Sequence, residues 1–391
     1  MIQKRICVIT ASRAEYGLLR WIMQDIKEDP SLVLQTVVTG AHLSAAYGMT
    51  VDEIERDGFT VDARIPMDLS DTSPRALGCE VGKLTQGLTA VLENLQPDIV
   101  VVLGDRYELL GIASACVIMT VPMAHIAGGE ITEGAIDEQI RHAVTKMSHL
   151  HFVANETYGA RVCQLGEEAW RVCVSGEPGL DNLFREEAMN REELSADVGL
   201  NFAAPTALVT FHPVTLEQSH LEDQLEALVQ AMATAQDRYG LQYLITHPGA
   251  DSGNDRIVAL WRDFVDGGEG RRLVSSLGQK RYFSALREST MMIGNSSSGI
   301  IEAPSFNLPT VNIGNRQGGR MRADNVIDVD YGVTNILDGI ERALAYDRSS
   351  PCENPYGDGR SSPRIVDFLR ENLEIRGRSG LLHKKFMDFQ A

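Results

Sequence analysis

Short, almost purely apolar runs alternate with longer amphipathic stretches along nearly the whole of this 391-residue chain. Several of these runs end in a turn residue that a helical pattern follows, as the run 99–103 does at Gly104. Strands that are apolar at every position are buried on both faces, and such strands occur in parallel sheets with helices packed on either side. The alternation therefore predicts an α/β protein built on parallel sheets.

The apolar runs fall into two successive sets. The first set comprises residues 6–10, 32–39, 99–103, 122–126, 150–154 and 172–175. The second set comprises residues 207–211, 241–246, 273–275, 291–294, 310–313 and 326–329. Two such sets predict two Rossmann-like doubly wound domains with an interdomain cleft, over residues 1–180 and 181–365. We expect the charged run 186–197 to form a linker helix, and residues 366–391 to form a helical segment that packs back on the N-terminal domain.

The charge and the cysteine pattern narrow the class of protein. Acidic residues outnumber basic residues by 54 to 36, for a formal net charge of −18, whereas nucleic acids and anionic membranes both require a basic surface. The sequence shows neither a secretory signal nor a run of eighteen apolar residues, and its cysteines form no C-x-x-C pair or Cys/His cluster. We therefore expect a cytoplasmic enzyme for a small molecule, with reduced thiols, no metal site, and neither nucleic acid nor membrane as a partner.

Ligands of open α/β sheets bind beyond the carboxyl ends of the strands, so polar residues that directly follow the apolar runs are candidates for a site. The most distinctive segment is 294–302, Gly-Asn-Ser-Ser-Ser-Gly-Ile-Ile-Glu. Its hydroxyl groups and the N–H groups of a helix start suit a phosphate. Glu302 would lie about one turn further on, where it can accept hydrogen bonds from ribose hydroxyls. The alternative is that a serine only caps an ordinary helix.

Charged residues also follow two runs of the first set. Arg13 stands at the start of the first predicted helix, where the helix dipole disfavours a cation. It is therefore either an anion contact or a surface partner of Glu15. Asp105 and Arg106 follow the run 99–103, and Asp105 is either a base or a helix cap.

Two histidines and one basic turn follow runs of the second set. His212 is succeeded by Pro213, and His247 repeats this arrangement one unit later. Each is a candidate for a ligand contact, although a lone histidine is more often structural. The Gly-rich basic turn 315–320 either binds a diphosphate or is a solvated loop.

Carboxylates are concentrated between residues 130 and 138. Several carboxylates beyond one strand suit proton transfer. Asp137 and Arg141, like Glu138 and His142, are also spaced i,i+4, so they can equally be ion pairs along one helix.

Seven segments together resemble the UDP-N-acetylglucosamine 2-epimerase family, and in particular its hydrolysing branch from bacterial sialic-acid and legionaminic-acid pathways. They are SRAEYG (12–17), VTGAHLSAAYG (38–48), LGDRYE (103–108), HIAGGEITEGAIDEQIRHAVTKMSHLHF (125–152), FHPVT (211–215), GNSSSGIIEAPS (294–305) and NIGNRQGGR (312–320). They occur in the family's order over most of the chain, which makes the resemblance specific.

The resemblance implies a glycosyltransferase-B-like fold, a UDP-sugar substrate, no cofactor, and a homodimer or a dimer of dimers. The residues that it implies for UDP binding are Arg13, Arg106, His212, Ser296, Ser297, Glu302 and Arg316. The implied reaction is anti elimination of UDP to a 2-acetamidoglucal, followed by addition of water to give the free 2-epimeric sugar. UDP-N-acetylglucosamine would yield N-acetylmannosamine and UDP in this way.

The motifs also imply acid–base roles. The catalytic residues that we expect are Asp105, Asp137, Glu130 and His212. Some relatives carry a glutamate that is treated as catalytic where this chain has Ala127, which can transfer no proton. Either one of Glu130, Glu133 and Glu138 takes its place, or two carboxylates suffice.

Other activities remain open at this point. One keeps the reaction but changes the substrate to UDP-2,4-diacetamido-2,4,6-trideoxyglucose, which is used in legionaminic-acid synthesis. Another is a glycosyltransferase on the same fold, against which the carboxylate-rich segment 130–138 argues. A third is a non-catalytic nucleotide-sugar binder, which would not need Asp105 and Asp137.

Overall fold

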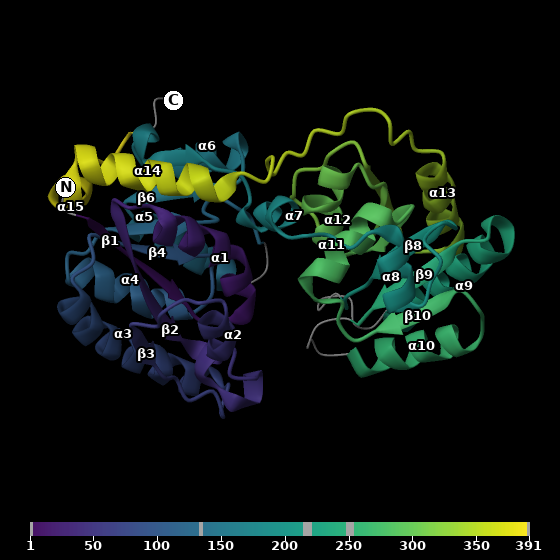
Figure 1. Cartoon of the computed structure of the whole chain (residues 1–391), viewed down its shortest axis with the longest axis horizontal. Coiled ribbons are helices and arrows are strands. Elements are labelled where there is room, and N and C mark those ends of the chain that lie inside the picture. Colours follow the sequence, from purple (N-terminus) through teal and green to yellow (C-terminus); the bar gives the residue numbers. More distant parts are fainter. Residues whose placement is uncertain (1–2, 133–135, 214–220, 248–253, 389–391) are drawn as a thin grey trace. The chain divides into compact units, whose positions relative to one another are not determined.

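A computed structural model of the chain describes residues 3–132, 136–213, 221–247 and 254–388. The chain folds into two compact α/β units (Figure 1), one made of Met1–Asn182 with Tyr356–Ala391 and the other made of Leu183–Pro355. Each unit is built on one parallel sheet with helices, so the predicted fold class is confirmed. Within the described ranges, no helix combines the length and the apolar character that crossing a membrane requires.

The first unit contains a seven-stranded parallel sheet in the order β3-β2-β1-β4-β5-β6-β7. Its strands are β1 (Lys4–Thr10), β2 (Leu32–Thr39), β3 (Ala63–Ile65), β4 (Ile99–Leu103), β5 (Met123–Ile126), β6 (Leu150–Val153) and β7 (Val172–Val174). The strand order reverses between β1 and β4, and ligands of doubly wound sheets bind at such a switch point. The edge strand β3 is the one element of this sheet that the apolar runs do not predict.

Helices cover both faces of this sheet. They are α1 (Arg13–Glu28), α2 (Val51–Arg56), α3 (Pro74–Leu95), α4 (Glu108–Ile118), α5 (Ile136–Met147), α6 (Glu156–Gln164), α14 (Ser361–Ile375) and α15 (Gly377–Leu382). Within the short helix α7 (Asp181–Arg185), the chain passes from the first unit to the second. Ile6 and Val8 of β1 pack with α1, α2 and α14, whereas Cys7 and Ile9 pack with α3 and α4. Successive residues of a strand face opposite sides, which explains why these strands are apolar throughout.

The C-terminal residues belong to the first unit. Helix α14 lies beside α1 (Figure 1), and its residues Ile365 and Leu369 are fully buried in the same core as Ile6 and Val8. The chain thus returns to the first unit after it has built the second.

The second unit contains a six-stranded parallel sheet in the order β10-β9-β8-β11-β12-β13. Its strands are β8 (Thr206–Thr210), β9 (Gln242–Thr246), β10 (Arg271–Val274), β11 (Met291–Gly294), β12 (Thr310–Ile313) and β13 (Val326–Val329). Its helices are α8 (Arg191–Val198), α9 (Leu221–Tyr239), α10 (Asn254–Asp266), α11 (Gly278–Glu288), α12 (Ser298–Ile301) and α13 (Val333–Leu344). Helices α9, α10 and α13 pack on one face, and α8 and α11 on the other. The switch point lies between β8 and β11.

The expectation of a linker helix over residues 186–197 is wrong. The helix in this region is α8, which begins after a capping box formed by Asn190 and Glu193. Its residue Leu194 is fully buried against the second sheet, in the same core as Leu208 and Leu244. The charged composition of α8 reflects its solvent face, and its buried face makes it part of the second unit.

Candidate active site

In the first unit, an ion pair joins the loop after β4 to helix α5. Gly104 takes a left-handed conformation with φ +88° and turns the chain out of β4. The carboxylate of Asp105 accepts a hydrogen bond from the guanidinium of Arg141, whose other contacts include the hydroxyl of Thr132 at 2.8 Å. Helix α4 has Tyr107 as its N-cap residue, so the alternative role of Asp105 as a helix cap is wrong.

The sequence analysis considered Arg141 only as a possible ion-pair partner of Asp137 and not as a residue of the site. It lies on the buried face of α5 with Ile140 and Val144, and only 5% of its surface is exposed. Its guanidinium also lies 3.6 Å from the carboxylate of Glu138. A charged residue in the apolar stripe of a helix is a signal of a buried partner, and this signal was available in the sequence.

The two carboxylates beside Arg141 differ in their proton affinity. Burial raises the pKa of Asp105, the charge of Asp137 raises it further, and Arg141 offsets only part of the shift. Partial burial also raises the pKa of Glu138, but the Thr132 amide and His142 lower it more, so its pKa lies below the usual range. Two carboxyl groups whose pKa values are displaced in opposite directions are the arrangement that acid–base catalysis uses.

Of the two i,i+4 pairs that the spacing suggested, the structure contains the one between Glu138 and His142, at 3.0 Å. Among the described residues, Arg141 pairs with Asp105 and Glu138 rather than with Asp137. Asp137 is half-buried on the first turn of α5, close enough to Asp105 for its charge to affect the pKa.

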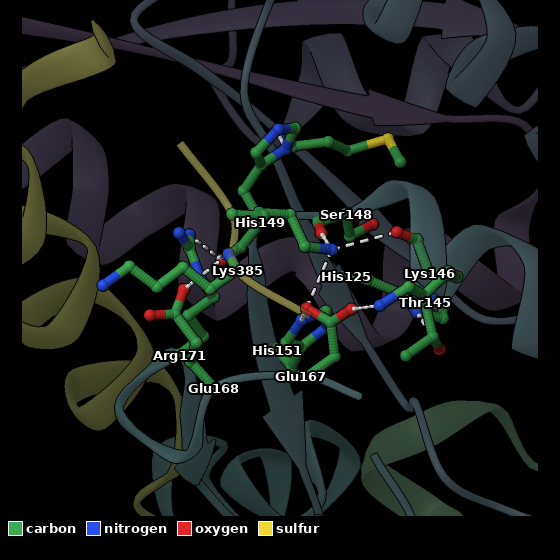
Figure 2. Close-up of polar contacts among 12 residues, drawn as sticks. His125, Thr145, Lys146, Ser148, His149, His151, Glu167, Glu168, Arg171 and Lys385 are labelled. Carbon is green, nitrogen blue, oxygen red and sulfur yellow. Dashed lines mark hydrogen bonds and ion pairs between the residues drawn. The ribbon is translucent and has the colours of Figure 1, made fainter. Parts of the chain in front are cut away.

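A buried histidine supports the loop that carries Asp105. His125 on β5 lies 2.7 Å from the carbonyl oxygen of Gly104 through Nε2 and 3.0 Å from the hydroxyl of Thr145 through Nδ1. Burial lowers the pKa of His125 to about 3, so the ring is neutral. Since a carbonyl can only accept, Nε2 carries the proton and Nδ1 accepts from Thr145. His125 therefore holds the β4 loop against α5; Figure 2 shows His125 together with Thr145.

A second cation and a buried carboxylate lie at the same switch point: Arg106 is on the loop after β4, and Glu15 is on α1. Glu15 on α1 accepts a hydrogen bond from the Ala11 amide at 2.7 Å, and its other oxygen lies 3.7 Å from Arg106. Arg106 also donates to Glu108 at 3.2 Å. Burial raises the pKa of Glu15 to about 7, although the Ala11 amide and Arg106 oppose this shift. Arg106 is thus held between two carboxylates where β1 and β4 diverge.

Arg13 has a different partner from the one that its sequence neighbours suggest. Its Nε atom lies 3.0 Å from the carboxylate of Glu53 on α2, and its side chain is 68% exposed. Glu15 instead contacts Ala11 and Arg106. The alternative of a surface pair between Arg13 and Glu15 is therefore wrong, and the guanidinium of Arg13 remains accessible to an anion.

The loop after β5 contains Ala127, at whose position the resemblance implies a glutamate in some relatives. Ala127 has a left-handed φ of +70°. The next turn needs Gly129, because a Cβ atom at this position would lie 2.3 Å from the carbonyl oxygen of Tyr158. Glu130 follows and is half-buried, and Glu133 lies outside the described residues.

In the second unit, the loop after β11 crosses close to β8. Gly294 has φ +140°, and a Cβ atom there would lie 1.9 Å from the carbonyl oxygen of Thr210, so only glycine fits. Ser297 occupies the cap position of α12, but its side chain makes no capping hydrogen bond. The hydroxyl of Ser296 instead accepts the backbone N–H of Ser298, the first residue of α12, at 3.4 Å, so a serine does bond to the start of this helix. The hydroxyls of Ser296 and Ser297 are half-buried.

Three of the expected UDP contacts meet at this loop. The side-chain amide of Asn295 makes hydrogen bonds with the backbone of His212. The backbone carbonyl oxygen of Asn295 accepts a hydrogen bond from Arg316 at 3.1 Å. The structure therefore brings His212, Ser296 and Arg316 together at the ends of β8, β11 and β12. His247 follows β9 one strand away.

Glu302 follows α12 and offers an acceptor. Its Oε2 atom is buried and has no hydrogen-bond partner within the described part of the chain. Burial raises the pKa of Glu302, while Ser298 and the charge of Arg320 lower it. A ligand hydroxyl that donates to Oε2 would satisfy this oxygen and favour the ionised form.

A separate ion network lies at the amino end of β6 and joins the C-terminal segment to the first unit (Figure 2). Glu167 is fully buried and contacts Lys146 at 2.7 Å, His151 at 2.9 Å and Lys384 at 2.8 Å. Although burial raises the pKa of Glu167, these partners lower it to about 2. The buried Arg171 donates to the carbonyl oxygens of two residues of the same segment, which lie 210 and 212 positions later. Both carboxylate oxygens of Glu167 have partners, whereas Nδ1 of His151 has none among the described residues. Because the network lies at the edge away from the loops above, we interpret it as structural.

Within the described ranges, no group of three or more His, Cys, Asp or Glu side chains is placed to hold a metal ion.

Residues 24–370 match the family described as UDP-N-acetylglucosamine 2-epimerase. A protein of Legionella pneumophila named UDP-N,N'-diacetylbacillosamine 2-epimerase (hydrolyzing) is 36% identical, over 94% of this chain and 96% of its own length. A protein of Campylobacter jejuni named GDP/UDP-N,N'-diacetylbacillosamine 2-epimerase (hydrolyzing) is 35% identical, over 99% of this chain and 100% of its own length.

Among solved structures, the UDP-GlcNAc 2-epimerase of Neisseria meningitidis bound to UDP-GlcNAc superposes with a TM-score of 0.75. The superposition covers 94% of this chain and 100% of that chain, at 17% sequence identity. At this identity the likeness concerns the fold.

Proposed function

Because the chain belongs to the UDP-N-acetylglucosamine 2-epimerase family and to its hydrolysing branch, we propose that it releases UDP from a UDP-linked 2-acetamido sugar and frees the 2-epimer of that sugar. The observation that carries the proposal is the arrangement of Asp105 and Glu138 on either side of the buried Arg141, with their pKa values displaced in opposite directions. The loops after β8, β11 and β12 support it with clustered hydroxyl groups and a cation.

The chemistry of the proposed reaction explains why it needs both the carboxylates of the first unit and the hydroxyls and cation of the second. The proton on C2 of the sugar is next to no carbonyl group and is weakly acidic, so cleavage of the anomeric C–O bond must lead. Negative charge then develops on the departing diphosphate, which cations and preorganised donors stabilise. We assign the stabilisation of the diphosphate to Arg316 and to the hydroxyls of Ser296 and Ser297. We assign the binding of the ribose hydroxyls to Glu302.

We assign the proton transfers to the carboxylates of the first unit. In the elimination, a carboxylate takes the C2 proton, the C1–O bond breaks, and UDP leaves a 2-acetamidoglucal. In the hydration, water adds its oxygen to C1 while C2 receives a proton on the opposite face, so UDP-sugar and water become free sugar and UDP. Asp105 can hold the proton because its pKa is raised, and Asp137 is its nearby acidic partner. Glu138 stays ionised and is our candidate for the group that Ala127 cannot supply.

We propose UDP-N,N'-diacetylbacillosamine as the substrate, because the two relatives above that are 36% and 35% identical carry that sugar in their names. This sugar is the 2,4-diacetamido-2,4,6-trideoxyglucose considered at the outset. UDP-N-acetylglucosamine is the second candidate, which the description of the family favours. The two substrates share UDP and the C2 acetamido group and differ at C4 and C6, so the same chemistry serves both.

The test is to incubate the protein in deuterated water with each UDP-sugar and to follow the products by NMR. We expect UDP, a free sugar inverted at C2, and deuterium at C2, with the larger kcat/KM for the diacetamido substrate. A C2 proton retained from the substrate would contradict the elimination. A larger kcat/KM for UDP-N-acetylglucosamine would leave the reaction in place and reverse the choice of substrate.

A further inference from the structure

We propose that Asn295 is a positioning residue that sets the UDP-binding geometry by fixing three loops at once, an inference that rests on the proposed function. Asn295 is fully buried where β11 ends. It occupies the switch point of the second sheet, where β8 and β11 are neighbours. None of its atoms is assigned to the reaction.

The side-chain amide of Asn295 holds the loop after β8. Its Oδ1 atom accepts the backbone N–H of His212 at 2.7 Å, and its Nδ2 atom donates to the carbonyl oxygen of the same residue at 2.8 Å. These two bonds satisfy both backbone groups of His212 with one side chain, just beyond the last residue of β8. An amide is needed, because it presents a donor and an acceptor side by side, whereas a carboxylate cannot donate.

The backbone carbonyl of Asn295 holds the loop after β12. It accepts a hydrogen bond from Arg316 at 3.1 Å and a second from the Nε2 atom of Gln317 at 2.9 Å. Gln317 is itself buried, whereas Arg316 lies at the surface of the loop. One oxygen atom thus orients the cation that we assign to the diphosphate and anchors the residue next to it.

The backbone N–H of Asn295 completes the junction by donating to Thr210 at 3.2 Å. His212, the two serines that follow Asn295, and Arg316 therefore take their positions from one buried residue. Because a binding site loses affinity when its groups must be ordered upon binding, loosening this junction should weaken UDP binding more than it slows the chemical step.

The experiment measures the Kd of UDP by calorimetry, and KM and kcat with the UDP-sugar, for the full-length protein and three variants. Asn295→Ala removes the amide that holds His212, and Gln317→Met removes one donor to the Asn295 carbonyl while keeping the side-chain length. Asn325→Ala is the matched control. Asn325 is also fully buried in the second sheet and donates to the Leu308 backbone at 2.7 Å, but it precedes β13 at the opposite, amino end of the strands.

We expect Asn295→Ala to raise the Kd of UDP and KM by tenfold to a hundredfold, the order expected when a buried polar group loses its partner. Gln317→Met should raise both by about three- to tenfold. In both variants kcat should change less than KM does. Asn325→Ala should lower the thermal midpoint comparably to Asn295→Ala and leave the Kd of UDP within twofold of wild type.

Two results would overturn the inference while the wild-type protein binds UDP normally. One is an unchanged Kd in Asn295→Ala, or in Gln317→Met if the first variant does not fold. The other is an equal loss of UDP affinity in Asn325→Ala, which would make the effect a general consequence of destabilisation. Failure of the wild-type protein itself to bind UDP would instead refute the proposed function and this inference with it.

Discussion

Replacing Arg141 with methionine should destabilise the protein by an amount that depends on pH. The substitution keeps much of the buried side-chain volume but removes the cation that faces Asp105 and Glu138. At about 4 Å and an effective dielectric constant of about 20, one such pair carries about 4 kcal/mol of Coulomb energy. The two carboxylates keep 24% and 26% of their side-chain exposure, so solvent screens part of this energy. We expect a net loss of about 2 kcal/mol at neutral and higher pH.

The direction of the pH dependence follows from both carboxyl groups. Without Arg141, the pKa of Asp105 rises further above its ordinary value, and the pKa of Glu138 loses one of the interactions that lower it. Both changes penalise the ionised groups of the folded state only. The Glu138 contribution is already present above about pH 4.5, because its folded pKa lies below the ordinary value. The Asp105 contribution grows as the pH rises above about 4 until Asp105 is ionised in the folded variant, so the total stability difference should be larger at high pH.

Urea unfolding of the wild-type protein and of Arg141→Met at about pH 4.5 and about pH 8 measures the difference in their free energies of unfolding. Arg342→Met is the matched control, because Arg342 pairs with Asp338 at 3.7 Å on the exposed face of α13. It should change the free energy of unfolding by less than about 0.5 kcal/mol at either pH. An equal loss for Arg141→Met at both pH values would refute the electrostatic reasoning and leave only a packing role.

The remaining predictions concern the two aspartates Asp105 and Asp137, the buried Glu15, and Lys384 of the C-terminal ion network. Asp105→Asn and Asp137→Asn should fold and bind UDP but release UDP from the substrate about 10²–10⁴ times more slowly; near-normal rates in both would remove them from the mechanism. Glu15→Gln should gain stability relative to wild type as the pH rises from about 4.5 to the folded pKa of about 7, by about 3 kcal/mol in urea unfolding, and a pH-independent difference would contradict the buried ionisation. Lys384→Met should lower the unfolding free energy by about 2 kcal/mol, whereas Lys385→Met, at an exposed position, should change it by less than about 0.5 kcal/mol; equal losses would argue against the ion network.

The strands could be located from the sequence because burial on both faces leaves a continuous apolar run. The exception is β3, which comprises only Ala63–Ile65 at the edge of its sheet and has Arg64 exposed at its centre. A strand with one neighbour does not need apolar residues at every position, so periodicity alone could not detect it. The helix α8 was located approximately but assigned to the wrong role, because its charged face dominates its composition.

The site residues could be found in sequence only where a motif marked them. Asp105 and Asp137 stand in such motifs and are predicted in this way, whereas the partner of Arg141 could not be predicted, because local spacing pointed to Asp137. Its actual partner Asp105 comes from another strand end, 36 positions away. The role of Asn295 was equally hidden, since its bonds to His212 span 83 positions and depend on β8 and β11 being neighbours in the sheet.

The return of the chain to the first unit also matters for its synthesis. A ribosome completes all seven strands of this unit before it makes the second unit, yet the acceptors of Arg171, Leu381 and His383, are translated only after the second unit. Until then a buried guanidinium and the carboxylate of Glu167 lack their C-terminal partners. The nascent first unit therefore stays incomplete while the second unit is synthesised, and incompletely packed units of this kind are prone to misfolding and aggregation.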